Sequence, residues 1–247
     1  MRLPLLVLPL PLALALLFAA CTESEEIVTQ DIVSAIPWAD QESAEYVILD
    51  ADDEEEVGEA TLSITRQGDQ FELSAAFHAT GEGPREEDES VILADAATLK
   101  PASVRREIFQ DGETTVLSGE YDEDEDVIRI TQTDSDGEER TVPRRLDEHY
   151  YDNESAIFLW RTVPFEEGYE ARYHTVQIQG EQPIVTVRVA GKEQVTVPAG
   201  TFETWRLELR AGAVDQTAWY ADTAERLLVQ YDNSRSIFRL TSPQAPG

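Results

Sequence analysis

The sequence predicts an all-β fold: a single curved antiparallel sheet of about 10–12 strands, forming an open barrel or a sandwich, with one short helix. Three observations lead to this expectation. Apolar and polar side chains alternate along much of the chain, compact turn signals separate the alternating segments, and only one segment has the features of a helix. A unit of roughly 200 residues is an ordinary size for one all-β domain.

The alternation is clearest in four segments, at residues 60–65, 71–78, 185–189 and 205–210. Successive side chains on a β-strand point to opposite faces of the sheet, so each segment predicts a strand with one face in a core and the other in water. In the last segment we expect Trp205, Leu207 and Leu209 to be buried, and the charged residues between them to reach solvent or carboxylates across the sheet.

Turn signals lie between the strands, at residues 68–69, 111–112, 122–126 and 134–137. Glycine beside aspartate, or a cluster of acidic residues, typically connects the strands of a hairpin at such close spacing. Residues 153–161 (NESAIFLWR) are the helical candidate, because Asn153 suits a helix N-cap and Pro164 ends the segment.

The N-terminus has the features of a cleaved signal peptide. Arg2 precedes an uncharged, apolar run over residues 3–20, which ends in two alanines before Cys21. A membrane-spanning helix is the alternative, since the run is just long enough for one. A membrane-spanning helix fits less well, because Pro9 and Pro11 interrupt the run and no positive residue stands directly after it.

The end of the signal, Phe18-Ala-Ala-Cys21, resembles the lipobox of bacterial lipoproteins, with phenylalanine where leucine is usual. The resemblance implies cleavage before Cys21 and diacylglycerol on its thiol, which makes the lipid bilayer a partner. Each buried methylene contributes about 0.8 kcal/mol, so two or three acyl chains form a firm anchor. Cys21 is the only cysteine, which leaves the mature domain without a disulfide or a thiol nucleophile.

These features divide the chain into a signal peptide at residues 1–20, the acylated cysteine with an acidic tether at 21–43, the β domain at 44–241 and a C-terminal tail at 242–247. The domain is therefore expected in the cell envelope, anchored to a membrane and outside the cytoplasm. Thr22 follows the cysteine instead of the aspartate that commonly retains lipoproteins at the inner membrane, which favours the outer membrane or cell surface.

The charge of the chain excludes some partners. There are 50 acidic and 19 basic side chains, for a net charge of −31. Such a surface repels nucleic acid and anionic lipid headgroups, so we expect neither as a partner. Its simplest role is to keep the protein solvated.

No catalytic, cofactor or metal-binding constellation stands out. His78, His149 and His174 form no zinc motif, and neither a P-loop nor a nucleophile elbow is present. We expect a non-enzymatic domain without metal or cofactor, although carboxylates are abundant enough that a carboxylate-based hydrolase stays an alternative. The acidic turn at 134–137 starts like an EF-hand loop but lacks its closing glutamate, and the turn at 122–126 lacks the glycine, so both predict hairpin turns that allow only weak divalent-cation binding.

Several aromatic residues suit either a core or a ligand cavity, and a core is the more usual place for aromatic side chains on a buried strand face. These residues are Trp160, Phe165, Trp205, Trp219 and Tyr220.

The last third of the chain resembles a family of uncharacterised bacterial exported proteins. The resemblance rests on Val197-Pro-Ala-Gly-Thr-Phe202, Trp205-Arg-Leu-Glu208, Trp219-Tyr-Ala-Asp222 and Leu228-Val-Gln230. In that family a strand ends in a VPAGTF-type turn and a later strand carries a W-x-x-D segment. Upstream positions extend the likeness over most of residues 44–241.

The family resemblance implies a strongly curved antiparallel sheet, loosely like the half-barrels of envelope lipoprotein carriers, and no established activity. By analogy of fold it suggests an apolar cavity. We expect a binding or interaction domain, with an apolar ligand or a protein as partner and ligand-binding residues that the sequence leaves unknown. An acidic surface spacer or adhesion module without a small-molecule site is the alternative.

The predicted lipid anchor can be tested by replacing the thiol of Cys21. We expect the Cys21→Ser variant to accumulate as uncleaved precursor and to lose acyl labelling, because the thiol is the only site for the diacylglycerol. Metabolic labelling with a tagged fatty acid, followed by gel analysis of membranes, measures both. Labelling of the variant at the wild-type level would contradict the anchor.

Overall fold

The computed structural model describes residues 27–80 and 86–244. The predicted signal peptide and Cys21 lie outside the described residues. Within the described part, 15 strands form one sheet. The strands are β1 (Gln41–Asp50), β2 (Glu56–Gln67), β3 (Gln70–Ala79), β4 (Glu87–Asp95), β5 (Pro101–Gln110), β6 (Glu113–Asp122), β7 (Val127–Thr133), β8 (Glu139–Arg145), β9 (Tyr150–Asp152), β10 (Glu170–Val176), β11 (Ile184–Val197), β12 (Gly200–Ala211), β13 (Val214–Ala221), β14 (Leu228–Asp232) and β15 (Ser236–Gln244).

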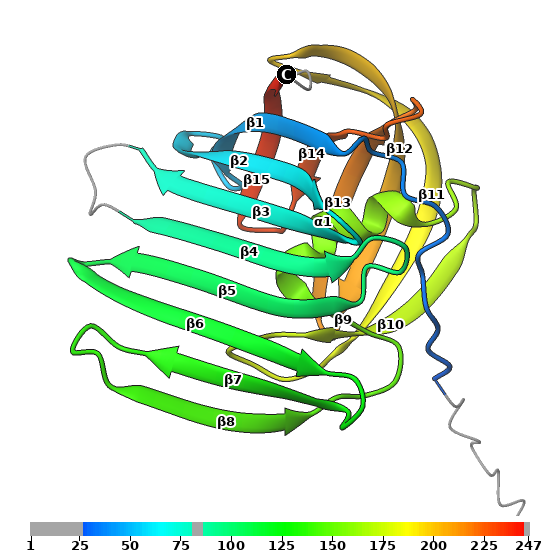
Figure 1. The fold of residues 1–247 in the computed structure, drawn as a ribbon. Helices are drawn as coiled ribbons and strands as arrows, with labels where there is room; N and C mark the ends of the chain where they lie inside the picture. Colours follow the sequence, from blue (N-terminus) through cyan, green and yellow to red (C-terminus); the bar gives the residue numbers. More distant parts are fainter. Residues whose placement is uncertain (1–26, 81–85, 245–247) are drawn as a thin grey trace, which may run out of the picture.

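Nearly every strand pairs with its neighbours in sequence (Figure 1). One wing of the sheet runs from β1 to β8 and the other from β15 back to β9, and the wings join where β1 pairs with β15. All pairs are antiparallel except β9 with β10. The sheet is not closed into a barrel, since β8 and β9 stand at its two ends.

The predicted fold class is therefore confirmed, as one curved sheet rather than two packed ones, but the expected 10–12 strands are too few. The difference arises where strands lack a one-sided apolar pattern. β8 (ERTVPRR) is exposed over nearly its whole length, so its sequence does not alternate. β9 has only 3 residues, too few to show a period.

The helical segment lies at residues 153–162, close to the predicted 153–161. It consists of a 3-10 turn (Asn153–Ser155), helix α1 (Ala156–Leu159) and a second 3-10 turn (Trp160–Thr162). The expected cap at Asn153 is wrong by one residue, because Asp152 accepts a hydrogen bond from the Glu154 N–H. An N-cap residue precedes the first turn and accepts a hydrogen bond from one of its free N–H groups, and aspartate is among the residues preferred there.

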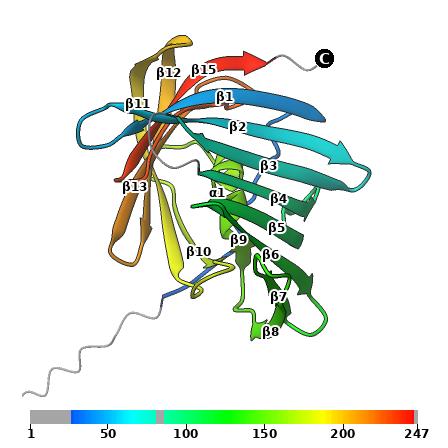
Figure 2. The same ribbon diagram turned by 90° about the vertical axis from the view of Figure 1, so that its left-hand side faces the viewer.

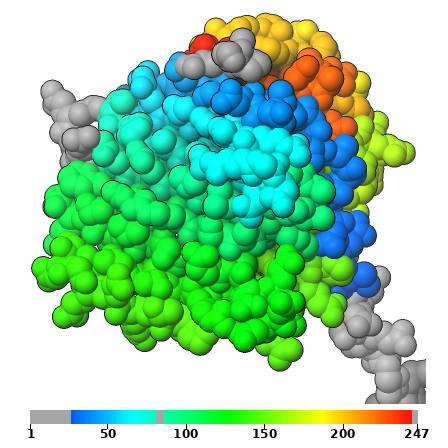
Figure 3. Space-filling view, viewed as in Figure 1, coloured from blue at the N-terminus to red at the C-terminus, as the bar shows by residue number. Residues whose placement is uncertain are grey.

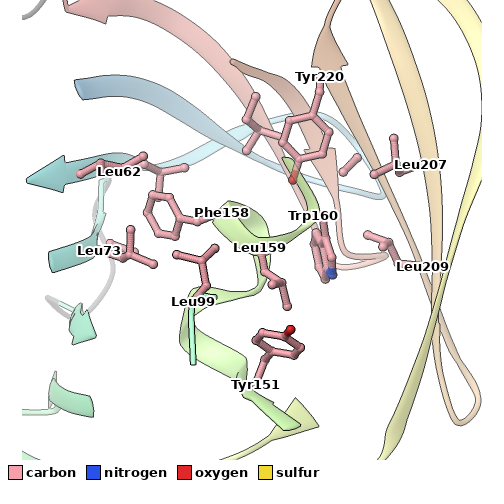
Figure 4. Close-up of a cluster of buried hydrophobic side chains, with 14 of the residues drawn as sticks. Leu62, Leu73, Leu99, Tyr151, Phe158, Leu159, Trp160, Leu207, Leu209 and Tyr220 are labelled. Atoms are coloured by element: carbon pink, nitrogen blue, oxygen red, sulfur yellow. The ribbon is translucent and has the colours of Figure 1, made fainter. Parts of the chain in front are cut away.

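The helical segment sits on the concave side of the sheet, between the two wings (Figure 2). In the buried cluster of Figure 4, Phe158 and Leu159 lie beside Leu99 and Tyr151, and Trp160 lies on the side of Leu209. The Tyr220 hydroxyl donates to the Ile157 carbonyl at 2.7 Å, and the Trp160 indole donates to the Tyr173 hydroxyl at 2.9 Å. On the convex side, side chains of the first wing form a continuous surface (Figure 3).

Residues 27–40, here called the N-terminal strap, pack on the domain instead of extending from it as part of the expected tether. The Gln30 N–H donates to the Arg172 carbonyl at 2.8 Å, and the Ser34 N–H donates to the Thr162 carbonyl at 3.0 Å. Ile32 and Trp38 are buried. The strap escapes prediction because a segment that crosses other elements without forming a strand has no period of its own.

Strand β12 follows the predicted alternation with one exception. Leu207 and Leu209 are buried, and Arg206 reaches Glu208 on the outer face at 3.1 Å. Trp205 is only half-buried, contrary to the prediction. Trp205 lies just beyond a bulge in β11, which falls between the partners of Leu207 and Arg206 and shifts the register there.

The VPAGTF-type turn joins β11 to β12 with Pro198 and Ala199 as its loop, since Val197 pairs with Gly200. Gly200 has φ +138°, a conformation that residues with a Cβ rarely adopt. The Ala199 N–H donates to the Leu240 carbonyl of β15 at 3.0 Å. The turn is thus a structural feature that fastens the hairpin to the far end of the chain.

Two neighbouring substitutions test the register of β12. We expect Leu207→Ala to lower the free energy of unfolding by about 2–5 kcal/mol, because it removes a fully buried side chain and leaves a cavity. Arg206→Ala should cost less than about 1 kcal/mol, since its ion pairs are half-exposed. Denaturant titration of both variants measures the difference. A larger loss for Arg206→Ala would mean that the two faces are assigned the wrong way round.

Candidate functional site

A partly enclosed cavity of about 300 Å³ lies between the helical segment and both wings of the sheet. Its volume is at the lower end of the range for small-molecule sites, about 300–1,000 Å³. Its apolar walls come from β3, the helical segment and β10 to β15. The apolar lining residues are Ala75, Phe77, Ala156, Ile157, Trp160, Tyr173, Pro183, Val185, Leu209, Ala211, Val214, Tyr231 and Phe238.

The aromatic part of the wall is held in place by specific contacts. The ring centroids of Trp160 and Tyr231 are 5.9 Å apart, and those of Tyr231 and Phe238 are 5.6 Å apart. Phe77 of the opposite wing packs edge-on against Phe238 at 5.7 Å. The Tyr231 hydroxyl donates to Gln216 Oε1 at 2.9 Å. Both wings therefore contribute aromatic rings to one continuous apolar wall.

Polar groups occupy a smaller part of the lining. The polar side chains are Ser90, Asn153, Glu154, Thr175, Gln177, Arg210, Gln216 and Asn233. Ser90 of β4 and Thr175 of β10 are each 2% exposed. Neither the Ser90 Oγ nor the Thr175 Oγ1 has a hydrogen-bond partner among the described residues. Such orphaned buried hydroxyls are uncommon in native proteins, where buried polar atoms are usually paired.

Glu154 links the cavity to a partly buried group of charges. Arg106 of β5 holds Asp88 with two hydrogen bonds, of 2.8 and 2.5 Å, and its third nitrogen lies 3.4 Å from Glu154 Oε1. Burial raises the pKa of the Glu154 carboxyl, and the Arg106 charge opposes that rise. Arg106 is thus committed to two carboxylates and offers no free charge to a ligand.

Asp152 lies beside this group but outside the cavity lining. It is 1% exposed and accepts hydrogen bonds from the Tyr121 hydroxyl at 2.5 Å and from the Glu154 N–H at 2.8 Å. Burial, followed by the nearby charge of Glu154, raises the pKa of the Asp152 carboxyl to about 7. Through these contacts, Asp152 caps the start of the helical segment.

The aromatic residues singled out in the sequence have different positions. Trp160 is buried and also lines the cavity. Phe165 is not part of the cavity lining, and its ring centroid lies 5.9 Å from that of Tyr220 and 6.1 Å from that of Trp205. Trp219 is half-buried and its indole donates to Glu193 of β11. Only Trp160 of these five belongs to the candidate site.

The W-x-x-D segment also has a structural explanation. Asp222 accepts a hydrogen bond from the Trp205 indole at 2.8 Å and from the Lys192 ammonium at 2.5 Å. The Lys192 Nζ lies 4.6 Å from the centre of the Trp205 ring. These contacts tie the end of β13 to the β11–β12 hairpin, so the motif stabilises the sheet and does not contact the cavity.

The histidines and acidic turns lie apart from the cavity. His149 is 3.4 Å from Asp31 of the strap, and His174 Nδ1 is 2.8 Å from the Glu148 carbonyl. In the turn at 134–137, Asp134 accepts backbone hydrogen bonds from Asp136 and Glu138, as an ordinary turn residue does. Over residues 27–80 and 86–244, no three His, Cys, Asp or Glu side chains are grouped to hold a metal ion.

A protein-family model matches this chain. It matches residues 46–237, which is most of the chain, and describes a protein of unknown function. The chain belongs to the DUF3108 family. The family resemblance inferred from the motifs is therefore confirmed for an uncharacterised β-domain family. No curated protein sequence matches this DUF3108 chain.

Two solved structures are similar to this DUF3108 domain. The first is the β-barrel-like protein of the DUF1849 domain of unknown function from Brucella abortus, with 12% identity, a TM-score of 0.55, and coverage of 87% of this chain and 100% of that one. The second is a protein from Bacteroides fragilis described as exported, with a YmcC-like fold, 12% identity, a TM-score of 0.32 and the same coverage. The first likeness supports the barrel-like fold.

No helix among the described residues has the length and apolar character needed to cross a membrane. The predicted anchor at Cys21 lies outside those residues, so this observation does not test it.

Sequence reasoning missed most of the cavity. Ser90 and Thr175 occupy inward positions in strands β4 and β10, where Ser90 is followed by the buried Ile92 and Thr175 is preceded by the buried Tyr173. A hydroxyl next to a buried residue on the inward face of a strand is the one signal that marks them. The two strands lie in different wings, so the sequence does not show that both face the same cavity.

The buried cap predicts a pH dependence. Because the pKa of Asp152 is about 7 in the folded protein and about 4 when unfolded, the folded state binds the proton more tightly. The contribution of Asp152 to stability is thus fully present below about pH 4 and is lost as the pH rises through about 7. Wild-type stability should fall by on the order of 2–4 kcal/mol over this range relative to Asp152→Asn.

Denaturant titrations at pH 4.5 and pH 8 measure this difference, with Asp147→Asn, an exposed carboxylate, as the matched control. If the Asp152→Asn protein follows the same pH profile as wild type, the raised pKa is refuted.

Proposed function

We propose that this DUF3108 protein is an exported lipoprotein, anchored through an acylated Cys21, whose domain binds an apolar ligand in the cavity beside helix α1. The observation that carries the proposal is the cavity itself, which is walled by apolar side chains from both wings and the helical segment. Ligand sites are typically concave, largely apolar and equipped with a few convergent polar groups. The cavity has each of these properties.

An acidic spacer or adhesion module needs only a well-packed interior. Protein interiors are close-packed, and voids larger than a water molecule are few. A space of about 300 Å³ lined by Trp160, Tyr231 and Phe238 is therefore better explained by a ligand than by a purely mechanical role. The acidic outer surface serves solubility in either case.

A hydrolase that acts through carboxylates is less well supported. Asp152 and Glu154 both have a raised pKa, a property expected of catalytic acids. Only Glu154 lines the cavity, however, and it faces Arg106. Asp152 is enclosed by Tyr121 and the first turn of the helical segment, so one substrate has no access to both.

The curved, open sheet also supports a carrier-like role at the cell envelope, by analogy of fold alone. The short link from Cys21 to the N-terminal strap would hold the domain close to its membrane. Lipids of that membrane are then the nearest source of an apolar ligand.

A matched pair of variants tests the proposal. A photoactivatable eight-carbon alkyl probe, added to membranes that contain the full chain, should crosslink to peptides around Trp160 and Leu209. Ala75 lines the cavity, so Ala75→Leu fills part of it and should reduce this crosslinking at least fivefold. Ala76 is on the opposite face of β3, so Ala76→Leu should leave it unchanged.

Mass spectrometry of the crosslinked peptides measures the yield. Equal yields for wild type and Ala75→Leu, or the absence of crosslinks to cavity peptides in wild type, would contradict the proposal.

A further inference from the structure

Two residues that line the cavity carry buried hydroxyls without a hydrogen-bond partner among the described residues. Ser90 reaches it from the first wing and Thr175 from the second, and both side chains are almost fully buried. A buried hydroxyl without a partner costs about 1–3 kcal/mol relative to one that is hydrogen-bonded. Ser90 and Thr175 both line the same cavity, so a molecule bound there is the nearest candidate partner for both hydroxyls.

The charges around the cavity restrict the chemistry of that molecule. Arg106 contacts the lining residue Glu154, and its partly buried guanidinium is already bound to Asp88 and Glu154. Arg210 is the one cation among the described lining residues, and its side chain is 69% exposed and lies 3.7 Å from Asp215. An anionic headgroup would meet the Glu154 carboxylate without a cation to balance it.

A hydroxyl group can both donate and accept hydrogen bonds, so Ser90 and Thr175 complement an uncharged group that does the same. The rest of the wall is apolar, including Phe77, Trp160 and Leu209. The volume of about 300 Å³ suits a short chain or one segment of a longer one.

We propose that the cavity is selective for uncharged amphiphiles, with the polar headgroup hydrogen-bonded to Ser90 and Thr175 and the alkyl chain against the aromatic wall. This selectivity rests on the proposed function, because it concerns the same cavity. It adds the class of ligand: an alkyl chain with a hydroxyl-type headgroup, in preference to a fatty acid anion.

Three photoactivatable probes with the same eight-carbon chain test the selectivity: one with a terminal alcohol, one with a carboxylate and one with no headgroup. Each is added to membranes that contain the full chain, and crosslinks to cavity peptides are quantified. We expect Ser90→Ala and Thr175→Val each to raise the half-saturating concentration of the alcohol probe about 3–10-fold, the equivalent of one lost hydrogen bond. Labelling by the headgroup-free probe should be unchanged, which also shows that both variants are folded.

The matched control is Ser63→Ala, which removes a half-buried hydroxyl from the opposite face of β2 and should not alter any probe. After correction for membrane partition, the half-saturating concentration of the carboxylate probe at pH 8 should be at least 10-fold higher than that of the alcohol probe.

Two outcomes would overturn the inference, and they are distinguishable. If the alcohol and headgroup-free probes label the cavity equally in wild type and in both variants, or if the carboxylate binds more tightly, the headgroup site is refuted while ligand binding stands. If no probe labels the cavity peptides, the proposed function fails with it.

Discussion

The arrangement of this domain depends on one buried ion pair. Arg161, at the end of the helical segment, donates to both carboxylate oxygens of Glu42 in β1, at 2.6 and 3.0 Å. It also donates to the Glu225 carbonyl at 2.5 Å, and its guanidinium lies 5.2 Å from the centre of the Trp38 ring. Removing one partner of such a pair costs about 3–5 kcal/mol, because the other charge stays buried. Arg161 thus fixes the helical segment to the strap, to the first strand and to the second wing together.

A helix of 4 residues has no stability of its own, because nucleation is unfavourable and few hydrogen bonds repay it. The helical segment persists because its ends are held, by the Asp152 cap at the start and by Arg161 at the end. Arg226 reinforces the latter by donating to the Arg161 and Val163 carbonyls at 3.0 and 2.7 Å. The helical segment therefore lies between the two wings and separates them, and the cavity is the space beside it.

Much of the fold follows from local sequence patterns, whereas the cavity does not. The period of two identified the inward faces of strands such as β12, because alternation is a local property of the strand. The strap, the bulge in β11 and the parallel β9–β10 pair arise from contacts between distant segments, which leave no period in the sequence. The cavity is even harder to predict from the sequence, since Ser90, Trp160 and Thr175 meet there only after the sheet has curved around the helical segment. The aromatic residues were recognised as core or cavity, but their sequence positions do not distinguish Trp160 from Trp219.

The most direct test of this account is a crystal structure of the protein under xenon pressure. Apolar cavities in proteins bind xenon, whose anomalous scattering locates it in the crystal. We expect xenon in the space bounded by Phe77, Trp160 and Leu209, and its loss when Ala75→Leu fills that space. A structure in which side chains from the two wings close the space and no xenon binds beside helix α1 would contradict the account.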